Sequence, residues 1–505
     1  MSLPWQKRLE YWLLRWQARL DHPRVDRLAP WLIAAASWAV LVLLALARSR
    51  ELGLGTSMAS PMQVTWLIGD GYKPESSLLG HNVLWEQAAF LLYPVSWLTS
   101  ILPTATTLLV LQAAALSIAV VPLWRLAKGV AGLRTGATTA IVAAYAAHSA
   151  VHDANLAGFH VEVLAIPALF GAVLYGLRGR WVLFGACVVV VLAARSDLGL
   201  AVAGLGGLLA LEGRRRAGLI TALVGVGWAV CAAVVIQPRY GGGAYPHVEA
   251  FARFGDDPAS VLWGMITHPH ELLGDVVSEA NFSKIVSLLA PVLFLPVVAP
   301  RYLLPAVPLY ALYLAADVPA GDLLEAQQTV PIIVFIFVAT VFALARTGRV
   351  LVEKVNVDRR FILALVFTAT LFFVRDSLSS PYEEPWGWGR RELDDRARLE
   401  AVDLVPDDGV VRASPAMLPL LTQRFGLFQL DTTADPDPVG AAEGVNWILL
   451  DAAAAPTWDS LDFEQFDLRL ARAGWVSEYD AEGIRVYRLP SPDEVQDQAG
   501  ASAGG

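Results

Sequence analysis

The chain has 505 residues, of which 55% are hydrophobic and only 17% are charged, and its mean hydropathy is +0.49. Soluble domains carry about 25% charged residues, so this composition excludes an ordinary soluble protein and indicates a polytopic membrane protein. From Asp376 onward there are 25 acidic and 10 basic residues, a net of −15 within a total of −9, so the rest carries +6 and nucleic acid is a poor partner for the acidic part.

Residues 1–30 form a basic segment that contains six Lys or Arg and three tryptophans between positions 5 and 28. The segment lacks the short apolar core and the cleavage site of a secretory signal. We expect an amphipathic helix on the anionic cytoplasmic surface of the membrane, and a solvated cytoplasmic tail is the alternative.

Apolar blocks follow that are long enough to enter a bilayer. They lie near 31–47, 83–101, 104–124, 136–150, 161–177, 181–194, 198–211, 217–236, 284–299, 303–315, 328–345 and 361–374. If all twelve crossed, the loops with Arg125, Arg178 and Arg214 would lie outside, against the positive-inside rule.

Leaving out one early block places all three basic loops in the cytoplasm. The block 83–101 is the best candidate, because it contains Glu86, Gln87 and Pro94. We therefore predict eleven spans within 31–375, a cytoplasmic N-terminus, and outer loops at 48–103 and 237–283. The predicted location is the plasma membrane.

With this topology, ionisable side chains gather at the outer side of the membrane. Charged groups within a membrane protein usually face a cavity or one another, because lipid does not solvate them. We therefore predict that four of them line one outer cavity, and that a fifth lies in another outer loop. The binding candidates are Asp153, His160, Arg195 and Asp197, with Glu325 in the other loop.

The acidic part, 376–490, alternates strand-like runs with helix-compatible stretches. The runs are GVVRAS, GLFQLD, VNWILLD and IRVYRL, and PAMLPLLTQR is a helix-compatible stretch. This pattern predicts a small extracytoplasmic α/β domain. Residues 491–505 are predicted to be a disordered tail. The predicted fold class is therefore mainly α, a polytopic helical membrane protein with a small C-terminal α/β domain.

No metal site is predicted from the sequence. The two cysteines, Cys187 and Cys231, lie in apolar blocks and form no CxxC motif, and His268 with His270 lacks further ligands. A divalent cation held by outer carboxylates stays open as a cofactor. Nothing in the sequence specifies an oligomeric state.

Several stretches in order resemble a family of predicted polytopic membrane proteins, domain of unknown function 2079. They are QVTWLIGDG, LLGHN, NLAGFH, ARSDLGL, VVRASPAMLPLLTQR, ILLD and GIRVYRL. That family is itself thought to resemble the GT-C glycosyltransferases, so the resemblance implies a helical membrane enzyme that uses a polyprenyl-phosphate-linked sugar. The chain departs from the family where TSMASPMQ has no acid, where Gly158 replaces an aspartate, and where Ser196 replaces a glutamate.

Sugar transfer from such a donor needs a carboxylate base on the outer side of the membrane. It also needs cationic or hydrogen-bonding groups for the leaving phosphate. Among the residues on the outer side, Asp70 or Glu86 suits the role of base, and Arg195 and His160 suit the role of binding the phosphate.

Two other hypotheses stay open. The missing loop acid favours a non-catalytic protein that binds a lipid-linked glycan, and a transporter or flippase is the third hypothesis. In each case the expected partner is a membrane lipid. The simpler interpretations are that Asp153 caps a helix, that Arg195 pairs only with Asp197, and that Glu325 lies in a solvated loop.

Overall fold

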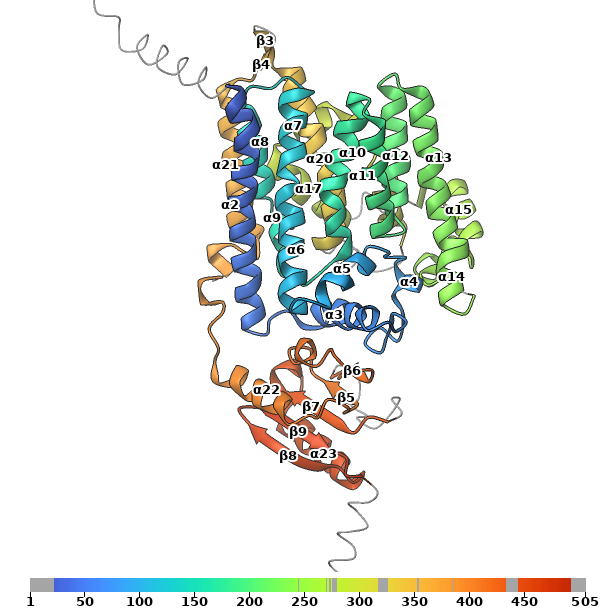
Figure 1. Cartoon of the computed structure of the whole chain (residues 1–505), viewed down its shortest axis with the longest axis vertical. Helices are drawn as coiled ribbons and strands as arrows, with labels where there is room; N and C mark the ends of the chain where they lie inside the picture. The colour runs from blue at the N-terminus through green and yellow to red at the C-terminus, as the bar shows by residue number, and fades with distance from the viewer. Residues whose placement is uncertain are drawn as a thin grey trace, which may run out of the picture. The chain divides into compact units, whose positions relative to one another are not determined.

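The computed structural model describes residues 22–491 except 244, 269, 272–273, 275–278, 317–325, 352–353, 384 and 433–443 (Figure 1). The described chain is mainly helical and divides into two compact units. The first contains Met1–Ala45, Leu84–Leu92 and Leu108–Trp386, and the second contains Leu46–Val83, Tyr93–Thr107 and Gly387–Gly505. Most of the predicted basic segment, together with Glu325 and almost all of the predicted tail, lies outside the described residues.

The helices of the first unit run side by side as a bundle (Figure 1). The principal ones are α2 (Pro23–Arg50), α6 (Thr104–Ile118), α7 (Val120–Gly129), α8 (Thr135–Ala146), α9 (Ser149–Leu156), α10 (Ile166–Arg178), α11 (Trp181–Ala194), α12 (Leu198–Leu211), α13 (Arg215–Cys231), α17 (Glu279–Leu289), α18 (Val307–Ala315), α20 (Ala326–Thr347) and α21 (Arg359–Asp376). Shorter elements connect them: α4 (Val83–Glu86), α14 (Gln237–Tyr240), α15 (Pro258–Thr267), the hairpin of β3 (Arg349–Leu351) and β4 (Lys354–Asn356), and 3-10 turns that include η1 (Val161–Ala165).

Six described helices are long and apolar enough to cross a membrane. They are Pro23–Arg50, Thr104–Gly129, Val161–Arg178, Arg215–Tyr240, Thr329–Thr347 and Arg359–Glu383. Three shorter apolar helices accompany them, Trp181–Ala194, Leu198–Leu211 and Asn281–Val292. The chain is therefore a helical membrane protein with several apolar helices, and the count of eleven spans stays a prediction.

The predicted non-crossing block 83–101 forms two short helices, α4 and α5 (Leu92–Thr99). Between them Ala88 has a positive φ of 51°, which ends a helix. A span needs about 20 residues, so neither helix is long enough to cross a bilayer by itself.

The core of the bundle surrounds α20. In the helix Thr329–Thr347, 83% of the 18-residue apolar stretch is buried inside the protein, and the side chains of Phe335 and Phe337 are completely enclosed. In contrast, only 17% of the corresponding apolar stretch is buried in the helices that contain α13 and α21. A helix that is apolar all round lies inside a bundle, while exposed apolar faces of this kind are what lipid contacts require.

Helices α12 and α13 pack with very close backbones. A Cβ added to Gly206 would lie 2.4 Å from the backbone nitrogen of Ala222, and one added to Gly225 would lie 2.4 Å from that of Ala203. Small residues at such spacing are typical of helix pairs in membranes.

The second unit contains a five-stranded sheet. The order is β6 (Leu427–Gln429), β5 (Val411–Ala413), β7 (Trp447–Asp451), β9 (Ile484–Arg488) and β8 (Val476–Ala481). Strand β5 pairs in parallel with β6 and β7, whereas β9 pairs antiparallel with β7 and β8. Each of the four predicted strand-like runs contains one of these strands. The stretch PAMLPLLTQR forms only the 3-10 turn η9 (Leu418–Leu420) rather than a helix.

Every residue of β7 is buried, because both faces of the sheet are covered. On one face Leu449 packs with Ala397 and Ala401 of α22 (Leu393–Asp403). On the other face Ile448 packs with Phe466 of α23 (Ser460–Arg472). A central strand that is covered on both faces reads as a continuous apolar run, as VNWILLD does.

Residues 46–83 belong to this unit, although the sequence interpretation placed them in the transmembrane domain. The buried Gln63 of α3 (Gly55–Gly69) explains the difference, because its amide donates to the backbone oxygen of Arg424 and to Ser77 Oγ, at 2.9 Å each. Its carbonyl accepts a hydrogen bond from Ser76, beside the hairpin of β1 (Glu75–Ser76) and β2 (His81–Asn82). This one amide therefore fastens the loop to the sheet domain.

Candidate functional site

The connection between α11 and α12 places two opposite charges together. Only three residues join these helices, so Arg195 and Asp197 lie at adjacent helix ends. The guanidinium donates to both carboxylate oxygens of Asp197, with Nε–Oδ1 at 2.7 Å and Nη2–Oδ2 at 2.9 Å. Such a two-pronged pair fixes the orientation of both side chains.

Two further side chains complete this ion cluster. Glu162 of η1 accepts from Nη1 of Arg195 at 2.7 Å. The Tyr313 hydroxyl of α18 accepts from Nη2 and donates to Asp197 Oδ2 at 2.7 Å. Burial by itself lowers the pKa of the Arg195 guanidinium, but the attraction of Asp197 and Glu162 raises that pKa well above its ordinary value. The arginine therefore stays charged, and its charge is neutralised inside the protein.

This cluster forms one wall of a polar pocket of about 200 Å³. Arg195, Asp197 and Tyr313 line it together with Glu86, Gln87, Tyr245 and His247. Burial and then Asp197 raise the pKa of Tyr245 to about 12, so its hydroxyl remains a donor at neutral pH. Pockets for drug-sized ligands are usually about 300–1,000 Å³, so this pocket suits one small polar unit.

Glu86 is the last residue of α4 and lines the pocket. The segment that follows it binds the end of α11 and the α11–α12 connection, because the amide of Leu91 donates to the Ala193 carbonyl and the amide of Ser196 donates to the Gln87 carbonyl, both at 2.9 Å. Gln237 and His247 both donate to the carbonyl of Glu86, also at 2.9 Å. The position of Glu86 is therefore fixed by main-chain contacts.

The charges of the pocket are predominantly negative. Among the described lining residues Asp197 and Glu86 are acidic and Arg195 is basic, and Glu162 contacts Arg195 without lining the pocket. Carboxylates and tyrosine hydroxyls bind hydroxyl groups well.

Asp153 does not occur among the described residues that line this pocket. Its carboxylate accepts a hydrogen bond from the Leu378 amide at 2.8 Å, after the end of α21. Burial, opposed by this hydrogen bond, raises the pKa of Asp153 to about 7. The neighbouring His152 contacts Ser379 at 2.9 Å. Asp153 therefore links α9 to the segment after α21, and it is not brought together with Arg195 and Asp197 in this pocket.

His160 is also absent from the described lining of the pocket. Its amide donates to Oε1 of the buried Gln112 at 2.7 Å, and the amide group of Gln112 donates to the carbonyls of Ala154 and Gly158. Gly158 has a φ of +108°, which favours glycine.

The other predicted acids lie elsewhere. Asp70 is exposed at the end of α3 and belongs to the second unit, whereas Glu86 belongs to the first. Glu325 lies outside the described residues. Within the described parts of the chain, no group of three or more His, Cys, Asp or Glu is placed to hold a metal ion.

The sequence interpretation omitted Glu162, Tyr245, His247 and Tyr313 from the candidate site. A signal existed for Glu162, because it stands alone in the apolar run FHVEVLA, and an isolated acid in such a run usually has a buried partner. For the two tyrosines and the histidine no local pattern was available.

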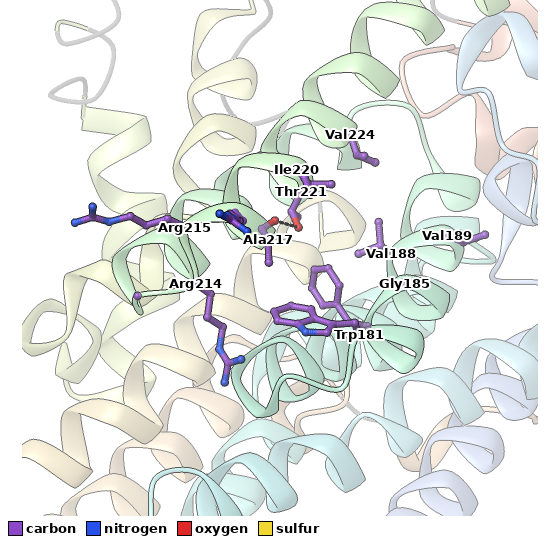
Figure 2. A pocket seen from close by; sticks show the side chains of 13 residues that line it. Trp181, Gly185, Val188, Val189, Arg214, Arg215, Ala217, Ile220, Thr221 and Val224 are labelled. Carbon is purple, nitrogen blue, oxygen red and sulfur yellow. Dashed lines mark hydrogen bonds between the residues drawn. The ribbon is translucent and has the colours of Figure 1, made fainter.

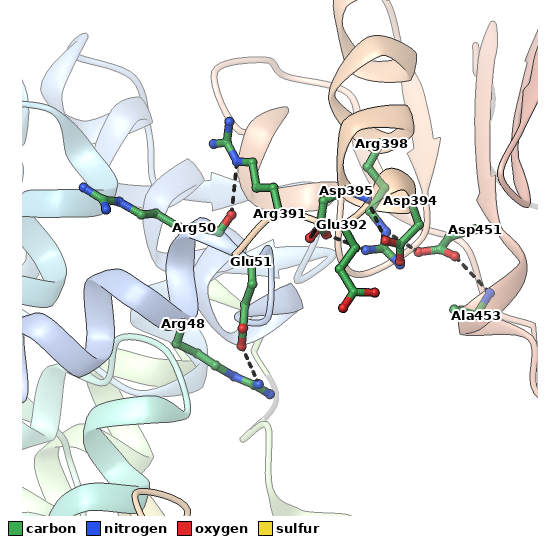
Figure 3. A network of polar contacts seen from close by, with 10 residues as sticks. All are labelled: Arg48, Arg50, Glu51, Arg391, Glu392, Asp394, Asp395, Arg398, Asp451 and Ala453. Carbon is green, nitrogen blue, oxygen red and sulfur yellow. Dashed lines mark hydrogen bonds and ion pairs between the residues drawn. The ribbon is translucent and has the colours of Figure 1, made fainter. Parts of the chain in front are cut away.

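A second ion cluster lies within the second unit (Figure 3). Arg398 of α22 contacts Asp451 Oδ2 at 2.8 Å, Asp395 Oδ1 at 2.7 Å and Asp394 Oδ2 at 2.9 Å. Asp451 ends β7, and its other oxygen accepts from the Ala453 amide at 2.9 Å. These contacts join a helix to the end of a strand, which assigns the aspartate of ILLD a structural role.

A family model described as "Predicted membrane protein (DUF2079)" matches residues 61–486. The match begins within α3 and ends in β9, so it covers the polar pocket and the Arg398 cluster. No curated protein matches the chain.

Proposed function

The chain belongs to the DUF2079 family of predicted membrane proteins, and from the chemistry of its pocket we propose that it is a GT-C-like glycosyltransferase. The proposed donor is a sugar linked to a polyprenyl phosphate. The observation that supports the proposal is that Glu86 lines the same pocket as Arg195, Asp197 and two tyrosines.

In the proposed reaction, an acceptor hydroxyl attacks the anomeric carbon of the donor sugar. The carbon–oxygen bond to the lipid phosphate breaks, and the phosphate leaves with the lipid. Glu86 takes the proton of the acceptor hydroxyl as general base. Asp197, held in place by Arg195, accepts a hydrogen bond from a sugar hydroxyl, and Tyr245 donates one.

Arg195 is not assigned to the leaving phosphate, because its charge is neutralised by Asp197 and Glu162. His247 is exposed at the pocket and is the cationic candidate for that role in its protonated form.

A second candidate function is binding of a lipid-linked glycan without transfer. The neutralised charge of Arg195 favours it, as does the acid-free stretch TSMASPMQ in the first outer loop. The same pocket would hold the sugar, and Glu86 would only bind a hydroxyl group.

The test is transfer from radiolabelled polyprenyl-phosphate sugars by the purified protein in proteoliposomes. We expect Glu86→Gln to lower the rate by about 10²-fold, the size of effect that a general base typically contributes, with donor binding retained. The exposed Glu75 does not line the pocket, so Glu75→Gln should retain the wild-type rate. An unchanged rate for Glu86→Gln would contradict the proposed base, and Asp70→Asn then tests the other candidate acid. Donor binding without transfer by the wild type would favour the second function.

We further propose the eleven-span topology in the plasma membrane, with the N-terminus in the cytoplasm and the C-terminal segment outside. It makes the loops with Arg180 and Arg214 cytoplasmic, as the positive-inside rule requires. In a background with Cys187 and Cys231 replaced by alanine, single cysteines test it at two exposed positions, Asp408 and Arg180. An impermeant maleimide should label 408 on intact cells, and 180 only after permeabilisation. Labelling of 180 on intact cells would refute this topology.

A further inference from the structure

A groove of about 880 Å³ lies between α11 and α13. Its walls are apolar, with Val188 on α11 opposite Ile220 and Val224 on α13 (Figure 2). At one end it is lined by Trp181 and by the consecutive arginines 214–216. The groove therefore combines an apolar channel with a cationic end.

The arginines at this end are available to an anionic ligand. Arg214 donates to the Leu177 carbonyl and lies over the Trp181 ring, 5.4 Å from its centroid. Arg215 and Arg216 are exposed, and among the described residues no acidic side chain pairs with either. The adjacent acid, Glu212, pairs with Arg301 at 3.0 Å instead.

Helix α13 begins at the same end of the groove. It is 17 residues long and starts at Arg215, so its first backbone N–H groups and the positive end of its dipole lie beside the arginine side chains. Helix N-termini of this kind favour phosphate groups. Two independent features, side-chain charge and helix dipole, thus favour an anion at this end.

The part of the groove beyond the arginines fits within one leaflet. Its lining on α13 runs from Ala217 to Val224, seven residue steps or about 10 Å at 1.5 Å per residue. Half of a hydrocarbon core is about 15 Å. The surrounding side chains are exposed, among them Val182 at 87%, Val189 at 65% and Ile220 at 62%, as expected for contact with acyl chains.

We propose that this groove binds an anionic phospholipid. The phosphate lies at Arg215, Arg216 and the start of α13, and one acyl chain lies between α11 and α13. Basic sites between membrane helices bind the headgroups of anionic lipids in this way. The site is separate from the polar pocket, because Trp181 and Arg195 flank the 14-residue α11, roughly 20 Å apart. It does not rest on the proposed transferase activity.

Gly185 allows a direct test of the acyl-chain part. It lines the groove on α11, and a Cβ added there meets no atom within 4 Å, so Gly185→Phe should fill the groove without disturbing the helices. Gly227 on α13 is the matched control, because it is exposed, has the same free space and does not line the groove. Binding of dioleoyl phosphatidylglycerol to detergent-solubilised protein is measured by native mass spectrometry. We expect affinity to fall at least tenfold in Gly185→Phe and to stay unchanged in Gly227→Phe.

The headgroup part is tested with the double variant R215Q/R216Q. The control is R359Q/R360Q, a pair of exposed arginines at the start of α21 that does not line the groove. We expect roughly tenfold weaker phosphatidylglycerol binding for the first pair only, given the usual contribution of basic residues near anionic lipid. Dioleoyl phosphatidylcholine should bind roughly tenfold more weakly than phosphatidylglycerol to the wild type. Inorganic phosphate at millimolar concentration should not displace the lipid.

Several results would overturn the proposal. They are equal binding of the two lipids, equal effects of the two arginine pairs, an unchanged affinity in Gly185→Phe, and displacement by phosphate alone. All substitutions are at exposed positions or in open space, and the thermal unfolding temperature of each variant verifies that its fold is intact.

Discussion

Replacing Arg398 with alanine is expected to destabilise the second unit by about 3–5 kcal/mol, the usual effect of removing one partner from a buried ion pair. Asp395 and Asp451 have side chains that are only 6% and 5% exposed, so the variant would remove the cation that both of these buried carboxylates share. Because Asp451 ends the central strand β7, the loss should spread through the sheet. Hydrogen exchange of the full-length protein measures it, as faster exchange of peptides that cover β7, with α20 as the internal reference.

A matched control exists in the same sheet. Arg488 pairs with Glu478 at 2.8 Å, but these side chains are 28% and 34% exposed. Surface pairs contribute about 0–1 kcal/mol, so Arg488→Ala should leave the exchange of β7 nearly unchanged. Equal exchange in the two variants would mean that the buried cluster does not stabilise the sheet. Combining Arg398→Met with Asp395→Asn and Asp451→Asn should restore much of the stability, because the remaining partner, Asp394, is 40% exposed and no buried charge is then left unpaired.

Replacing Arg195 with alanine is expected to destabilise the helical unit, also by about 3–5 kcal/mol. The variant leaves Glu162 and Asp197 close together without their shared cation, at side-chain exposures of 5% and 17%. Tyr313 also loses its donor. The two carboxylates would repel each other and separate the ends of α11 and α12 from η1. Thermal unfolding of the protein in detergent should therefore occur at a clearly lower temperature.

The control for this prediction is Arg301→Ala. Arg301 also pairs with one glutamate, Glu212, at 3.0 Å, but its side chain is 40% exposed, so the expected loss is at most about 1 kcal/mol. Arg195→Lys keeps the charge without the two-pronged geometry and should be intermediate. If Arg195→Ala unfolds at the wild-type temperature, the cluster is not a structural support. Any role of Arg195 would then lie in ligand binding rather than in stability.

The membrane helices could be predicted because lipid imposes a local requirement. An apolar helix of a membrane protein is apolar over nearly its whole length, so the blocks 181–194 and 198–211 have the same bounds as the apolar helices α11 and α12. The buried strands β5, β7 and β9 were visible for the same reason, as short apolar runs. Strand β8 was missed, because it is a largely exposed edge with the polar sequence VSEYDA. Such an edge has no apolar signal of its own.

The candidate site was only partly predictable. Arg195 and Asp197 are two residues apart, so their pairing follows from the chain itself. Glu162 and Tyr313 reach the same guanidinium from 33 and 118 residues away. Asp153 seemed equivalent to these residues in sequence, but its partner is the amide of Leu378, 225 residues away. A helix end offers several directions to a polar side chain, and only the packing of distant helices selects one.

The sequence by itself therefore determined which segments are apolar, which are acidic, and where basic residues interrupt the helices. These properties are local, because lipid or water solvates each short segment according to its own residues. It placed the arginines 214–216 in a loop, but only the tertiary structure put them at the end of an apolar groove beside Trp181. In the same way Gln63 binds the carbonyl of Arg424 across 361 residues, which moves the first outer loop into the second unit. Contacts of this kind are decided by which surfaces bury one another best, and that is a property of the whole fold.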